Sequence, residues 1–209
     1  GRIDPALSDA FDAAVDGGED PAASWALALS AADAQMHTTV LPDPLKAALL
    51  TWAASRHQRG RGDLDAAEAF LGRAVALDNG DVARLQQYAA LQRRSPGHAL
   101  VETLRSLEVA LGDVPESIGV LREAAEVELA TEGDRASVLE LLSALKDRSA
   151  EHWKRGDESA RPHATWAMRT QVDLYAAGGE HPEAVAVLIK AAEDLPFSVA
   201  ESRALRAAA

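Results

Sequence analysis

The 209 residues are 47% hydrophobic but only 4% aromatic, with a formal net charge of −12 and no cysteine. The hydrophobic share is enough for a sizeable core, and the lack of cysteine excludes disulfides and thiol chemistry. The acidic balance repels phosphate backbones and so argues against nucleic-acid binding, and no apolar run approaches the roughly 20 residues of a membrane span.

Helix signals dominate the sequence, and strand signals are almost absent. Alanine, the strongest helix former, is abundant. No run of β-branched residues alternates with polar ones, which is the pattern of a strand. We therefore expect an all-α fold.

The acidic N-terminal region carries the first helix-start signals. Residues 1–44 hold eight Asp or Glu side chains and a single base. Asp4-Pro5, Asp20-Pro21 and Asp43-Pro44 each place an N-cap acceptor before a proline at the first helical position. These signals predict helices over 5–15, 21–37 and 44–59. We expect residues 1–43 to form an acidic hairpin that caps the rest of the chain, with a removable lid over a basic groove as the alternative.

The stretch 60–79 has the clearest helical pattern. Gly62 and Asp63 supply a turn and a helix start. Apolar residues then recur every three or four positions, which is one face of a helix: Leu64, Ala67, Leu71, Ala74 and Leu77. Asn79-Gly80 should end the helix, because both residues tolerate the left-handed conformation. We interpret the stretch as the second helix of a helical hairpin.

The remaining helices follow at short intervals. Their predicted ranges are 81–93, 98–111, 115–131, 134–155, 163–177 and 182–194. Ser198 and Glu201 form a capping box for one more helix. This makes about eleven helices joined by short connections, an arrangement typical of antiparallel hairpins.

Two segments share a further pattern. In 48–81, the turn Gly62-Asp63 precedes two small residues seven positions apart, Ala67 and Ala74. In 165–197, a tyrosine, a turn glycine, a small pair and a closing proline occur in the same order: Tyr175, Gly179, Ala184, Ala191 and Pro196. These segments resemble the tetratricopeptide repeat, a helical hairpin of about 34 residues. Asn79 stands where the first segment should have its closing proline.

The resemblance implies an α-solenoid of antiparallel hairpins, a right-handed superhelix that runs through 44–209 as one continuous array. The first helix of each hairpin would line a concave groove. The groove residues implied in this way are Trp52, Arg56, Arg59, Gln86, Arg93, Glu123, Trp166, Arg169 and Asp173. The Lys/Asn clamp of family members that bind acidic chaperone tails is absent, so that ligand is not expected.

Two basic clusters allow a binding or a structural interpretation. Arg56, Arg59 and Arg61 could grip an acidic peptide, but a solvated helix end is favoured. The second cluster contains Lys146, Arg148, His152, Trp153, Lys154, Arg155 and Arg161. Its acidic neighbours favour a solvated mixed-charge helix over a nucleic-acid surface.

Catalysis and metal binding find little support in the residue pattern. The six histidines show no metal-ligand spacing, and no nucleophile elbow or phosphate loop occurs. Carboxylates such as Glu123, Glu126 and Glu128 lie on predicted helices without a sign of burial. For the four tryptophans we favour packing roles, with Trp52 and Trp166 as the first to test for binding.

We therefore expect a non-enzymatic, cofactor-free and metal-free scaffold. It would bind an unidentified protein or peptide in a concave groove, without nucleic acid or membrane span. No oligomeric state follows from the sequence. The lack of cysteine and of a signal peptide favours a cytoplasmic location. Because the chain begins with Gly and runs helical to its end, the alternative is a helical regulatory or substrate-recruiting region of a larger multidomain enzyme or signalling protein.

Overall fold

A computed structural model of the chain describes residues 43–131 and 133–209. This described part contains nine α-helices and no strand, so the all-α prediction is confirmed there. The two helices expected at 5–15 and 21–37, and with them the acidic cap, lie outside the described residues. The chain divides into two compact units, with the boundary between Leu91 and Gln92.

In the first unit, α3 (Asp43–Arg56) packs against α4 (Leu64–Leu77), and α5 (Val82–Gln92) follows. The predicted apolar face of α4 is the face that packs, since Ala67, Leu71 and Ala74 are buried. Two small clusters form the core between the helices. One joins Ala47, Leu50 and Ala74, and the other joins Ala54, Ala67, Leu71 and Leu91. The alanines allow the helix axes to come close.

The connection between the two helices of the predicted hairpin and the end of its second helix both differ from expectation. The helix expected over 44–59 ends at Arg56, and His57–Arg61 forms a π-helical turn closed by Gly62 at φ +65°. Buried His57, the first residue of this turn, stacks on Phe70 of α4, with ring centroids 5.3 Å apart. At its C-terminal end, α4 is followed by extended Asp78, and Gly80 does not adopt the left-handed conformation expected there. Leu77 is 36% exposed and lies outside the packed face.

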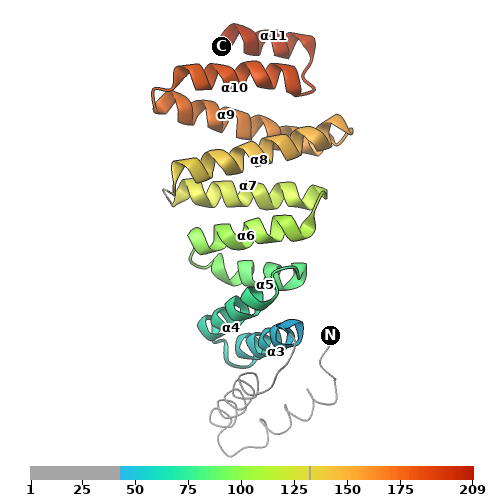
Figure 1. The fold of residues 1–209 in the computed structure, drawn as a ribbon, viewed down its shortest axis with the longest axis vertical. Helices are drawn as coiled ribbons and strands as arrows, with labels where there is room; N and C mark the ends of the chain where they lie inside the picture. The colour runs from blue at the N-terminus through green and yellow to red at the C-terminus, as the bar shows by residue number, and fades with distance from the viewer. Residues whose placement is uncertain (1–42, 132) are drawn as a thin grey trace, which may run out of the picture. The chain divides into compact units, whose positions relative to one another are not determined.

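The second unit consists of six consecutive helices. They are α6 (His98–Leu111), α7 (Pro115–Ala130), α8 (Arg135–Lys154), α9 (Arg161–Ala177), α10 (His181–Asp194) and α11 (Val199–Ala208). Figure 1 shows each helix running back along the one before it, with the connections alternating between the two ends. Each helix packs on the next in chain order. The hairpin arrangement expected for this region is therefore observed within the unit.

The helix boundaries of this unit follow the sequence signals closely. Asp134 caps α8 by accepting a hydrogen bond from the Ser137 N–H, and Ser198 forms the predicted capping box with Glu201. The connector expected before α9 is shorter than predicted. A 3₁₀ turn, Glu158–Ala160, leads straight into α9 at Arg161.

Side chains also join alternate helices of the second unit. Among α7, α9 and α11, Arg122 of α7 contacts Trp166 of α9, and Arg161 of α9 donates to Glu201 of α11 at 2.5 Å. Between α6 and α8, Arg105 pairs with Glu140 at 3.3 Å. These contacts join α6, α7, α8, α9 and α11 to a second neighbour in the chain as well as to the adjacent helix.

None of the helices between residues 43 and 209, position 132 aside, combines the length and apolar character that a bilayer crossing requires.

Candidate partner-binding surface

Four of the predicted groove residues belong to the first unit. Trp52 and Arg56 lie one turn apart on α3, and the Arg56 guanidinium carbon is 5.6 Å from the centroid of the Trp52 ring. Arg59 lies in the π-helical turn and Gln86 on α5, both exposed. The structure therefore brings Trp52 and Arg56 together as a cation–π pair.

The other predicted residues belong to the second unit. Arg93, just beyond α5, donates two hydrogen bonds to Glu123 of α7, at 2.5 and 2.8 Å. This bidentate pair raises the pKa of Arg93, chiefly through the hydrogen bonds to Glu123. Arg169 and Asp173 are exposed on α9, one and two turns beyond Trp166.

Trp166 lies half-buried on α9, beneath an arginine that the sequence did not single out. The Arg122 guanidinium carbon of α7 is 3.9 Å from the centroid of the Trp166 ring, close enough for direct stacking. Arg122 also donates from Nε to Glu126 Oε1 at 2.7 Å, one turn along α7. A carboxylate on the same helix thus holds the arginine over the indole ring.

His163 lies one turn before Trp166 on α9. Its Nδ1 is buried and has no hydrogen-bond partner among the described residues. Burial lowers the pKa of His163, and the positive charge of Arg122 lowers it further. The imidazole is therefore neutral at neutral pH.

We call the residues Arg93, Arg122, Glu123, Glu126, His163 and Trp166 the α7–α9 face. Both of its arginines are paired with carboxylates of α7, so its charges are largely balanced within the unit. An acidic peptide would have to displace those carboxylates. The half-buried indole and the neutral imidazole instead suit a partner that lays an apolar or aromatic side chain on the face and makes polar contacts at its edge.

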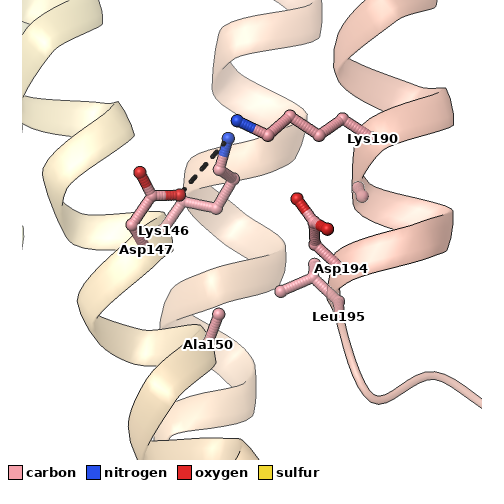
Figure 2. Close-up of a pocket in the computed structure, with 7 residues that line it drawn as sticks. Lys146, Asp147, Ala150, Lys190, Asp194 and Leu195 are labelled. Atoms are coloured by element: carbon pink, nitrogen blue, oxygen red, sulfur yellow. Dashed lines mark ion pairs between the residues drawn. The ribbon is translucent and has the colours of Figure 1, made fainter.

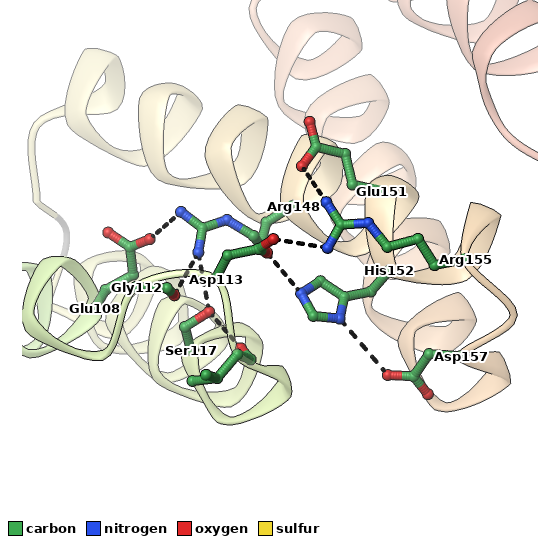
Figure 3. Close-up of polar contacts among 10 residues, drawn as sticks. Glu108, Gly112, Asp113, Ser117, Arg148, Glu151, His152, Arg155 and Asp157 are labelled. Atoms are coloured by element: carbon green, nitrogen blue, oxygen red, sulfur yellow. Dashed lines mark hydrogen bonds and ion pairs between the residues drawn. The ribbon is translucent and has the colours of Figure 1, made fainter.

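A polar cluster at one end of α8 was not predicted as a unit (Figure 3). Arg148 donates to the Gly112 carbonyl at 2.7 Å, to Ser117 Oγ at 3.2 Å and to Glu108 at 2.6 Å. These contacts fasten the connection between α6 and α7 to α8. The sequence offered no signal for them, because the partners lie 31 to 40 positions away.

The same cluster contains a buried histidine between carboxylates. His152 Nε2 lies 2.9 Å from Asp113 Oδ1, and its Nδ1 lies 3.9 Å from Asp157 Oδ2. Arg155 donates to Asp113 Oδ2 at 2.7 Å. The hydrogen bonds from Arg155 and His152 hold the pKa of Asp113 below its ordinary value.

Although the cluster contains serine, histidine and aspartate, it lacks a nucleophile arrangement. The Ser117 hydroxyl donates to the Val114 carbonyl at 2.7 Å and accepts from Arg148, a permanent cation that cannot take its proton. The polar groups of the cluster satisfy one another, which indicates a structural joint between helices.

The structure corrects two sequence interpretations. The second basic cluster is not a solvated helix throughout, because Lys146, His152 and Trp153 are buried. Trp153 packs edge-on against Phe197, with ring centroids 5.3 Å apart. Glu128, expected to be solvated, is 2% exposed. It is covered by the turn at Gly133, where a Cβ would come within 2.5 Å of the Glu128 carboxyl carbon.

Metal ligands do not gather in the described part of the chain, where no group of three or more His, Asp or Glu side chains is placed to hold an ion. A comparison of the sequence with protein-family models and with curated proteins finds no match.

Proposed function

We propose that this chain is a protein-interaction scaffold, a stack of helical hairpins of the tetratricopeptide type that binds a peptide or a partner helix. The observation that carries the proposal is the half-buried Trp166, stacked under Arg122 between α7 and α9. Tryptophan and arginine are the residues most enriched at binding hot spots. Here they meet on two helices that the repeat pattern assigns to the concave side.

The packing pattern supports the solenoid interpretation. Each helix of the second unit contacts the next one in the chain, and side chains join α7 to α9 and α9 to α11. In a stack of hairpins, the first helices form one layer and the second helices another. On this interpretation α7, α9 and α11 share the layer that binds the partner.

The chemistry of the α7–α9 face favours an amphipathic helical partner. Its apolar side chain would lie on Trp166, and its polar side chains would meet exposed Arg169 and Asp173 at the edge. Binding of this kind uses anchors spaced along one helix face.

A display library of amphipathic helical peptides provides the test. Peptides selected on the whole chain are measured by fluorescence anisotropy against three variants. Trp166→Leu removes the anchor and should weaken binding by about 2 kcal/mol, or roughly 30-fold. Arg169→Glu, at an exposed position, should weaken it several-fold without disturbing the fold.

Lys154→Glu on α8 is the matched control, an exposed cation changed in the same way on a helix outside the layer of α7, α9 and α11. Peptides that bind all three variants as tightly as the unmodified chain would contradict the proposal. A selection that yields no binding peptide would do the same.

A further inference from the structure

A small pocket between α8 and α10 brings two lysine side chains to one place (Figure 2). It lies on helices other than those of the α7–α9 face. Its lining residues are Lys146, Asp147 and Ala150 of α8, Lys190, Ala191 and Asp194 of α10, and Leu195. Figure 2 shows the two lysine side chains reaching toward each other from the two helices.

Lys146 is an unusual cation because it is only 9% exposed. Its ion pair with neighbouring Asp147 is 3.7 Å long, beyond hydrogen-bond distance. An ammonium group carries three donors, and the described residues give none of them a hydrogen-bond acceptor. The Nζ atom itself is not fully buried, so a water molecule or an anion that enters the pocket can supply the missing acceptors.

Lys190 adds a second positive charge to the same pocket. It is exposed, and among the described residues no carboxylate pairs with it. Two ammonium groups beside each other repel, and an oxygen anion between them would relieve that repulsion while accepting from both. The pocket walls strengthen this attraction, because Ala150, Ala191 and Leu195 are buried and apolar.

The carboxylate of Asp194 acts in the opposite direction. It lines the same pocket as the two lysines without pairing with either of them in the described part of the chain. A carboxylate at this place repels an anion, so it limits the affinity. Removing this negative charge should therefore tighten anion binding, and this effect distinguishes a specific anion site from nonspecific binding.

From these features we propose that the pocket binds a small oxyanion group, a carboxylate or a phosphate, between Lys146 and Lys190. The pocket volume is about 20 Å³, which is space for little more than one water molecule. Only the charged group fits inside, and the rest of its ligand projects into solvent. The same chemistry is offered by a free anion and by an acidic group at the end of a larger molecule.

The test is a titration of the whole chain with inorganic phosphate and, separately, with sodium acetate, at constant ionic strength set by chloride. Amide chemical shifts are followed by NMR. We expect saturable shifts around Ala150 and Ala191 with at least one of the two anions. Phosphate alone, acetate alone or both then identifies the preferred class of ligand.

Four variants decide whether the lysines form the site. Lys146→Met should weaken binding about tenfold, the loss of one charge-assisted hydrogen bond. Lys190→Gln should weaken it several-fold, and because this residue is exposed the variant keeps its fold. Asp194→Asn should tighten binding. Lys154→Met, an exposed lysine on the same helix, is the control and should leave binding unchanged.

Shifts that do not saturate with either anion would overturn the proposal. So would equal binding by the chain with Lys190→Gln and by the unmodified chain, even if Lys146→Met proved too unstable to measure.

Discussion

Arg84 offers the sharpest test of what holds the first unit together. It lies on α5, is only 5% exposed, and joins three parts of the unit. Its Nε donates to Thr51 Oγ1 of α3 at 2.9 Å, and its Nη1 donates to the Asp78 carbonyl at 2.6 Å. Both its Nη atoms also pair with carboxylates, with Asp78 Oδ2 at 3.0 Å and with Asp81 Oδ2 at 3.3 Å.

Arg84→Met keeps the apolar stem and removes the guanidinium. A hydrogen bond to a charged group contributes about 1.5–3 kcal/mol. The side chains of Asp78 and Asp81 are 33% and 45% exposed, so water replaces much of what they lose. The bonds to Thr51 and to the Asp78 carbonyl are replaced less well. We therefore expect the free energy of unfolding to fall by about 2–3 kcal/mol.

Urea unfolding followed by circular dichroism measures this loss, and hydrogen exchange should place it in the first unit. Arg59→Met, an exposed arginine of the same unit, is the control and should change the free energy by no more than about 0.5 kcal/mol. If both variants behave alike, the structural role inferred for Arg84 is wrong.

The pH dependence provides a second check. The hydrogen bond from Arg84 holds the pKa of Asp78 below its ordinary value of 3.8. A lowered pKa contributes stability above the ordinary value, and this contribution is lost as the pH falls through the lowered value. The difference in stability between the chain with Arg84→Met and the unmodified chain should therefore narrow below about pH 4. A difference that stays constant would refute the coupling.

Four further changes test other parts of the structure. Gly133→Ala should lower the free energy of unfolding by about 1–3 kcal/mol, because its Cβ meets buried Glu128. Gly119→Ala, where a Cβ meets nothing within 4 Å, should raise it by about 0.5–1 kcal/mol in the same urea assay. The lowered pKa of Asp113 means that its carboxylate contributes stability at neutral pH that is lost as the pH falls. In the variant Asp113→Asn the melting temperature should therefore fall less between neutral and acid pH than in the unmodified chain. Ser198→Ala should speed hydrogen exchange in α11 by removing its cap, a loss of about 1 kcal/mol that unchanged exchange rates would contradict.

Helix positions were predictable because their signals are local. The limits of α6 were predicted to the residue, since a Ser-Pro-Gly break precedes it and Gly112 adopts φ +71° after it. The cap of α11 was equally visible in Ser198 and Glu201. The π-helical turn after α3 was not predicted. It contains His57, which packs on Phe70 of the next helix, and no local sequence signal indicates that contact.

Contacts between helices were much harder to predict. Charge patterning favoured a solvated Lys146, and the sequence showed no sign that Glu128 is buried. Both are buried, because helix packing decides which face of a charged helix is covered. Of the predicted groove residues, Arg93, Glu123 and Trp166 lie on the α7–α9 face, the surface that we regard as the best candidate. The contact of Trp166 with Arg122 of α7 could not be inferred, because the register of two helices depends on side-chain packing along their whole length.

The side-chain contacts between alternate helices also indicate how the length of such a helix stack can change. The side-chain hydrogen bonds between helices of the second unit join residues 30 to 45 positions apart, about the length of one hairpin. A hairpin added or removed would therefore change the partners of its immediate neighbours and leave the more distant pairs intact. The length of the stack is therefore an adjustable dimension, because a protein built in this way can be extended or shortened one hairpin at a time.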